Sequence, residues 1–175
     1  MNVYKRKDIP LLSLVNNYKF DYKDAYECVV ANTKSITPDD IQVAFWTIKP
    51  KWLNTLFKLR NLLVKPFGLK GEDKDENNKF EQCIRNGATN NLMSVVAKSE
   101  NETVLCLNDK HLKAYLSVYI EKFSTDNQKI SIITLVEFHN WLGYVYFYAI
   151  YPFHHIVVRS MLRNTLNRLL ENDNR

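Results

Sequence analysis

Hydrophobic residues alternate with polar ones, or form short continuous runs, along much of the chain. These patterns predict β-strands at residues 18–30, 80–84, 92–98, 103–107, 112–123 and 130–139. The polar connections at 99–102 and 124–127 have the composition of hairpin turns. Since these turns are short, the strands that they join must run antiparallel, and the pattern predicts an antiparallel meander.

Three segments have helical patterns instead. Thr37 suits an N-cap, with Asp39 and Asp40 in the first turn of a short helix that ends near residue 48. A second helix is predicted between Pro50 and Pro66, because proline is accepted at a helix start and cannot continue one. The last helix covers 141–170, and its internal proline at position 152 is expected to kink it or split it.

The order of elements is therefore one strand, two short helices, a meander and a long C-terminal helix. We expect an α+β fold of helix-grip type, in which a curved antiparallel sheet wraps around the C-terminal helix, because one apolar sheet face must be covered. The predicted division is an N-terminal extension at 1–17, a single domain at 18–170 and a disordered tail at 171–175.

Composition narrows the function classes. The chain has 175 residues, a net charge of +5, 46% hydrophobic residues and only four glycines. Neither Gly-rich phosphate-binding motif occurs, and no cofactor is predicted. Lys51, Lys58 and Lys65 form a basic stripe on the second helix, but an acid-rich run at 72–79 follows it. The stripe therefore fits a solvated helix face better than a nucleic-acid site, and no nucleic-acid partner is predicted.

The cysteines bear on the compartment. Cys28, Cys83 and Cys106 are odd in number and widely spaced, which favours reduced thiols and a cytoplasmic location. The longest apolar run, 142–153, is too short to cross a bilayer, and no signal peptide is predicted.

Four strings then carry a family resemblance. They are KWL with LRNLLVKPFGLK (51–53 and 59–70), DKHL (109–112), HNWLG (139–143) and PFHHIVVRSML (152–162). In this order the chain resembles the bacterial domain-of-unknown-function family 2867 over roughly residues 18–166. The resemblance implies the START-like form of the helix-grip fold. The family implies no activity.

Arg60 lies among apolar positions of the second helix. A buried charge needs a partner, so Arg60 must meet a carboxylate, a carbonyl, water or a ligand. Glu137, on a predicted strand with two apolar faces, is one candidate partner, and Glu121 and Asp109 are others. If Arg60 faces a cavity instead, it becomes the anchor of an anionic group.

A second candidate site lies at one end of the sheet. Pairing of 112–123 with 130–139 about a turn near Thr125 places His111 opposite His139, with Asp109 and Asn140 close by. Two imidazoles and a carboxylate suit a metal ion or acid–base chemistry. The alternative is that they cap strand ends; no metal site is predicted.

Tyrosines supply the third candidate. Tyr115 and Tyr119 share a strand face, and Tyr144, Tyr148 and Tyr151 recur at helical spacing on the last helix. Facing one another, these rings would line a pocket for an amphipathic ligand; otherwise they edge the core. The adjacent histidines 154 and 155 are expected to be structural, with one facing the sheet and the other solvent.

The preferred function is non-enzymatic binding of a hydrophobic, amphipathic or anionic small molecule between the sheet and the C-terminal helix. The predicted ligand-binding residues are Arg60, His111, Tyr115, Tyr119, Glu137, His139 and Tyr148. One alternative is a protein-interaction domain that forms a homodimer through the 130–139 strand. The other is an enzyme that uses the His/Asp corner.

Overall fold

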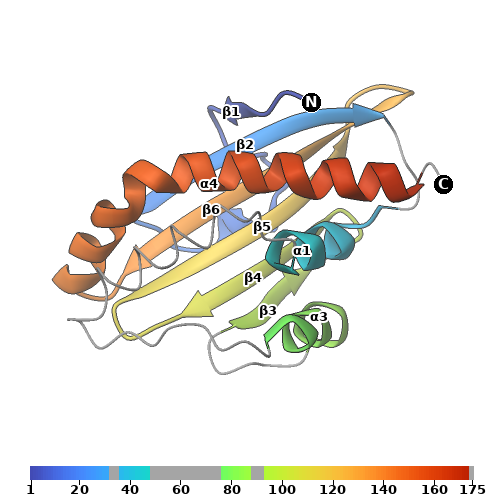
Figure 1. Ribbon diagram of the computed structural model, residues 1–175. Coiled ribbons are helices and arrows are strands. Elements are labelled where there is room, and N and C mark those ends of the chain that lie inside the picture. Colours follow the sequence, from blue (N-terminus) through green and yellow to red (C-terminus); the bar gives the residue numbers. More distant parts are fainter. Residues whose placement is uncertain (32–35, 48–75, 88–92, 174–175) are drawn as a thin grey trace.

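A six-stranded antiparallel sheet forms the body of the protein, with the strand order β1-β2-β6-β5-β4-β3 (Figure 1). The computed structural model describes residues 1–31, 36–47, 76–87 and 93–173. The strands are β1 (Tyr4–Arg6), β2 (Tyr22–Ala31), β3 (Met93–Lys98), β4 (Glu102–Asn108), β5 (Leu112–Lys122) and β6 (Asn127–Phe138). The helical elements are the 3-10 turn η1 (Leu14–Asn17), α1 (Pro38–Thr47), α3 (Glu76–Asn86) and α4 (Trp141–Asp173). An α+β fold with a long C-terminal helix is confirmed.

The predicted register of the central hairpin is confirmed. Leu112 pairs with Phe138 and Lys122 with Gln128, so the turn is centred on Thr125. The amide of Asn127 donates to the Ser124 hydroxyl at 3.1 Å, which closes the turn. Because a hairpin turn sets the register of both strands, this local signal is enough to align them over their full length.

One face of the sheet packs against α4. Val158, Met161, Leu162 and Leu166 recur at helical spacing and pack with residues of β2, β5 and β6 in the largest core cluster. Figure 1 shows α4 crossing the sheet, with α1 beside it. The helix bends in its first half, as Pro152 predicts, since proline lacks the N–H that would bond one turn back.

The opposite face is covered by the N-terminal segment. Val15 of η1 is fully buried in a second cluster with residues of β2, β4, β5 and β6, and the rings of Tyr18 and Tyr115 stack at 4.4 Å. The sequence predicted residues 1–17 to be an extension outside the domain. In the structure they supply the strand β1 and the turn η1, which covers this face. Both faces of the sheet are covered.

The α1 start is confirmed in detail. The amide of Asp40 donates to the Thr37 hydroxyl at 3.2 Å, and the Thr37 amide donates to the Asp40 carboxylate at 3.0 Å. This reciprocal capping satisfies backbone donors that a helix start leaves open. Burial acts to raise the pKa of Asp40, but the hydrogen bonds that its carboxylate accepts from the Thr37 hydroxyl and amide, together with the Arg85 guanidinium, outweigh burial and lower it.

The strand predicted at 80–84 is wrong, because these residues belong to α3. Phe80, Cys83 and Ile84 all face the core, which is a spacing of three and four residues and therefore helical. Over five residues the run was too short to separate the two periods. Arg85 then ties α3 to α1 by an ion pair with Asp40 at 2.9 Å.

The predicted second helix, with Arg60 and the lysine stripe, lies outside the described residues. Within the described part of the chain, no helix is both long enough and apolar enough to pass through a lipid bilayer.

Candidate functional site

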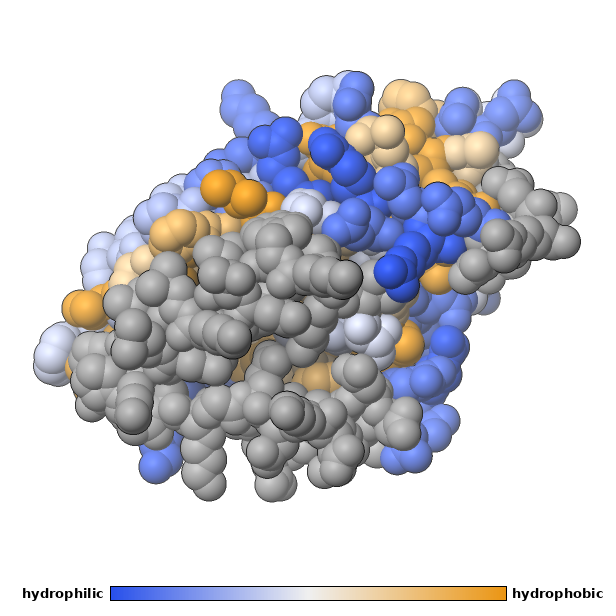
Figure 2. Space-filling view, in the orientation of Figure 1, coloured by the Kyte–Doolittle hydropathy of each residue, from blue (hydrophilic) through white to orange (hydrophobic). Residues whose placement is uncertain are grey.

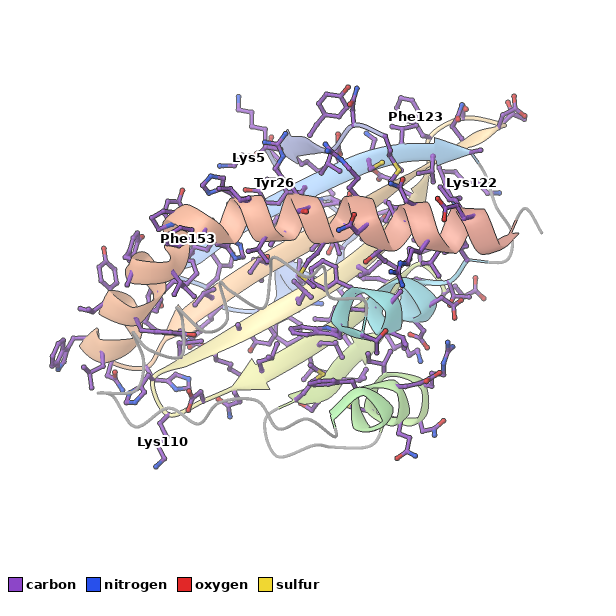
Figure 3. The ribbon with its side chains drawn as sticks, in the orientation of Figure 1. Lys5, Tyr26, Lys110, Lys122, Phe123 and Phe153 are labelled. Carbon is purple, nitrogen blue, oxygen red and sulfur yellow. The ribbon has the colours of Figure 1, made fainter. Side chains whose placement is uncertain are left out.

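A cluster of polar side chains lies between the sheet and α4. We call Tyr22, Asp24, Thr134 and His154 the polar cluster. Asp24 on β2 is directly opposite Thr134 on β6, and His154 reaches Asp24 from α4. The Tyr22 hydroxyl donates to Asp24 Oδ2 at 2.7 Å, and His154 Nε2 lies 3.1 Å from the same oxygen. Figure 3 marks Tyr26, the next β2 residue on this face, beside α4.

Several polar atoms of this cluster are buried without a hydrogen bond. In the described part of the chain, four buried side-chain atoms have no such partner, and three belong to the polar cluster: Asp24 Oδ1, Thr134 Oγ1 and His154 Nε2. The His154 contact is therefore short but poorly aligned. Buried polar groups are nearly always hydrogen-bonded, and each exception asks for a physical explanation. Because three exceptions lie at one place, we take the polar cluster as the candidate site.

The polar cluster favours an ionised carboxylate between neutral phenols. Burial acts to raise the pKa of Asp24, but His154 and the hydroxyl neighbours outweigh it, and the pKa is lowered. Burial, with the adjacent Asp24 charge, raises the pKa of Tyr26 to about 12 and moves that of Tyr22 further in the same direction. Asp24 is thus negative at neutral pH, and both tyrosines keep their protons.

Aromatic rings extend from the polar cluster to the surface. We call Phe138, Tyr144, Phe147, Tyr148 and Tyr151 the aromatic wall. Its innermost ring, Phe147, is 3% exposed and lies 4.6 Å from the Tyr22 ring, whereas Tyr144 and Tyr148 are 52% and 43% exposed. The rings of Tyr144 and Tyr148 lie 4.5 Å apart in a tilted arrangement. The ring of Phe138 lies 5.2 Å from Tyr144 and 5.5 Å from Phe147. These contacts form a continuous series of rings from the surface to Tyr22, whose hydroxyl donates to Asp24.

The first half of α4 also presents an apolar outer surface. Large hydrophobic side chains remain exposed here, and Figure 2 shows hydrophobic colour along this part of the molecule. They are Trp141, Tyr144, Val145, Tyr148, Phe153 and Ile156, which we call the outer stripe. Contiguous exposed apolar residues of this kind are characteristic of surfaces that bind a ligand or another protein.

The two predicted tyrosine sets do not face each other. Tyr115 and Tyr119 pack with Val15 on the sheet face under the N-terminal segment, whereas Tyr148 contacts Phe138 on the α4 face. The sheet separates them, so they cannot line one pocket. Parity along β5 grouped Tyr115 and Tyr119 correctly, but both sheet faces are apolar, and parity cannot tell which of them the helix covers.

Glu137 is partly buried and lies on the same face as Tyr115, opposite Lys113 in the ladder. Its predicted contact with Arg60 lies outside the described residues. Glu121, another predicted partner of Arg60, forms an ion pair with Arg6 at 2.7 Å.

The His/Asp corner, which consists of Asp109, His111, His139 and Asn140, lies next to the start of α4. The amide of His139 donates to the His111 carbonyl at 2.9 Å, which confirms that these residues are opposite one another. Asn140 caps α4 by accepting from the Gly143 amide at 3.1 Å, and it donates to the Lys110 carbonyl at 3.2 Å. A Cβ at Gly143 would lie 2.0 Å from the His111 carbonyl oxygen, so only glycine permits this approach.

These contacts give the corner a structural role. The Asp109 carboxylate accepts from the Lys110 amide at 2.6 Å. Nowhere in the described ranges do three or more His, Cys, Asp or Glu side chains gather as they would to hold a metal ion. One of the adjacent histidines faces the sheet, as predicted, and it is His154. The other, His155, was expected in solvent but is partly buried, and its ring contacts Tyr151.

Asp24, Tyr22 and Thr134 were missed in the sequence, although a signal was present. Tyr22, Asp24, Tyr26 and Cys28 alternate along one face of β2, and all but Asp24 suit a core. An acidic residue at a buried strand position is informative, because carboxylates are almost never fully buried without partners. Its partner His154 lies 130 positions along the chain, and only the fold brings the two together.

Comparison with known proteins agrees with the resemblance in the sequence. The family model described as "Protein of unknown function (DUF2867)" matches residues 18–161. The chain belongs to this family. The matched region of DUF2867 contains every residue of the polar cluster and the aromatic wall. No curated protein and no solved structure matches the chain.

Proposed function

We propose that this protein binds an amphipathic small molecule between the sheet and the first half of α4. The polar group of the ligand would bind at Asp24 and Thr134, and its apolar part would lie along the aromatic wall. Small-molecule sites combine apolar walls with a few convergent polar groups, and this region has both. The protein acts by binding and not by catalysis.

One observation carries the proposal. Asp24 Oδ1, Thr134 Oγ1 and His154 Nε2 are buried, close together and without hydrogen bonds. A polar core that served stability alone would lose free energy by leaving these atoms unpaired, about 1–3 kcal/mol for each buried group. A ligand that hydrogen-bonds to them recovers that free energy on binding.

The direct experiment is native mass spectrometry of the purified protein, followed by identification of any released molecule. We expect a bound small molecule in the wild type and its loss in Asp24→Asn. Asp126→Asn changes an exposed carboxylate of the 124–127 turn and serves as the matched control. If the wild type carries no molecule, and a thermal-shift screen finds none whose effect depends on Asp24, the proposal fails.

The second candidate function is self-association, and the outer stripe favours it. The strand originally expected to mediate a homodimer, β6, lies between β2 and β5, and Ile130 to Val136 are all buried. A second copy would therefore dock on α4. Sedimentation at increasing concentration tests this: a dimer that Ile156→Glu dissociates supports it, and a monomer throughout contradicts it.

The finer structural assignment is also a proposal. A sheet whose face is crossed by a long C-terminal helix supports the START-like, helix-grip class. Cys28, Cys83 and Cys106 are all buried, which agrees with a reducing, cytoplasmic location.

A further inference from the structure

The charge at the polar cluster indicates which ligand it would accept. Only 1% of the Asp24 side chain is exposed, and its contact with His154 is poorly aligned. A buried carboxylate is costly unless an opposite charge and well-directed hydrogen bonds compensate it. Oδ1, the oxygen that neither Tyr22 nor His154 contacts, is the atom that a further donor would reach.

The helix above supplies no permanent cation to this carboxylate. From Trp141 to Val158, α4 has no Lys, Arg, Asp or Glu. The first charged residue, Arg159, donates its guanidinium to the Val3 carbonyl at 3.0 Å. Within the described residues, the ion pair of Asp24 is with His154, and no Lys or Arg forms one with it. A ligand that carries its own positive charge would therefore complete the site.

The rings around the carboxylate favour the same class. The Tyr22 ring lies 4.6 Å from Phe147, 5.6 Å from Tyr151 and 6.2 Å from His154. The electron-rich faces of aromatic rings attract ammonium groups, and a desolvated contact of this kind contributes about 2 kcal/mol. An anionic ligand would instead meet repulsion from Asp24, and a neutral one would gain no attraction between opposite charges.

We infer that the ligand is an organic cation, either an amine or a quaternary ammonium compound, with a hydrophobic group. This inference rests on the proposed function. Its cationic nitrogen would lie beside Asp24. If it is an amine, it would also donate hydrogen bonds to Asp24 Oδ1 and Thr134 Oγ1. The hydrophobic group would extend along Phe147 and Tyr151 toward the exposed rings of Tyr144 and Tyr148.

Three probes of similar shape test this inference: phenethylamine, phenethyl alcohol and phenylacetate, by calorimetric titration at neutral pH. We expect the amine to bind at least about tenfold more tightly than the alcohol, and phenylacetate to bind most weakly. In Asp24→Asn this preference should disappear, and in the control Asp126→Asn it should persist. If Asp24→Asn does not fold, Thr134→Val replaces it, with weaker binding of the amine as the expected result.

The outcomes separate the inference from the proposed function. The alcohol or phenylacetate could bind as tightly as the amine, or more tightly, in a manner that depends on Asp24. That result overturns the inference that the ligand is a cation, but leaves the proposed ligand binding intact. A co-purified molecule that is neutral or anionic does the same. If no probe binds and no molecule co-purifies, both proposals fail. A co-purified cation whose retention requires Asp24 supports the inference even where the short probes are too small to bind.

Discussion

Two buried carboxylates lie on opposite faces of the same sheet, and they differ in how fully they are hydrogen-bonded. Glu102, under the N-terminal segment, is 1% exposed and accepts from the Ser13 hydroxyl at 2.6 Å, the Leu14 amide at 2.6 Å and the Ser117 hydroxyl at 2.5 Å. Asp24, under α4, is also buried, but its Oδ1 has no hydrogen bond.

The difference separates a structural role from a binding role. Glu102 receives every donor from its own chain, and by accepting from the Leu14 amide it holds η1 against the sheet. Asp24 Oδ2 contacts Tyr22 and His154, whereas Oδ1 accepts no hydrogen bond and is open to another donor. A buried carboxylate is therefore a candidate site only when its own chain leaves it incomplete, and burial alone does not indicate function.

Glu102→Gln should give the largest loss of stability, about 3 kcal/mol, because the amide NH₂ would face donors that need an acceptor. Urea denaturation measures the loss, and hydrogen exchange should increase at residues 9–18. Glu100→Gln, an exposed change in the same hairpin, is the control and should stay within about 0.5 kcal/mol. An unchanged free energy of unfolding would mean that Glu102 does not hold η1.

Tyr22→Phe should cost about 2 kcal/mol, because it removes a hydrogen bond to a buried charge and leaves Asp24 less satisfied. Chemical denaturation measures the change. The matched control is Tyr151→Phe, which removes the hydroxyl of a neighbouring ring of the aromatic wall. Its expected change is within about 0.5 kcal/mol. Equal losses in the two variants would show that the hydrogen bond from Tyr22 to Asp24 adds no stability beyond that of another tyrosine hydroxyl in this region.

Asp24→Asn should change stability less, by under about 1 kcal/mol in either direction, while ligand binding is lost. Removing the charge also removes its desolvation cost, so the two effects nearly cancel. The measurement pairs denaturation of ligand-free protein with native mass spectrometry. A loss as large as that of Glu102→Gln would place Asp24 in the structural class and contradict the comparison.

The smallest expected effect is on acid stability. The pKa of Asp24 is lowered in the fold from an ordinary value of 3.8, so its ionised form contributes stability above that value and loses it as pH falls through the folded pKa. Wild type should therefore lose stability more steeply than Asp24→Asn below about pH 4. Denaturation at several acidic pH values measures the difference; parallel curves would show that the folded pKa is not lowered.

Local patterns predicted most of the fold. The 124–127 turn sets the β5–β6 register, and Thr37 with Asp40 begins α1, because both signals act over three or four residues. The candidate site was predicted less well. Parity grouped Tyr115 and Tyr119 correctly on one face. The hypothesis that this face lies opposite the tyrosines of α4 was wrong, because the N-terminal segment covers it. The assignment of 80–84 failed for a related reason, since a five-residue apolar run fits either period.

The sequence by itself determined the element types, the hairpin register, the bend at Pro152 and membership of the family, because these depend on neighbours in the chain or on motifs in order. Only the tertiary structure decided which sheet face each segment covers, and which buried carboxylate is left incomplete. Asp24 and Glu102 both occur in strands rich in apolar residues. Their partners Ser13 and His154 come from distant segments, and hydrogen bonds between such segments exist only once the chain has folded.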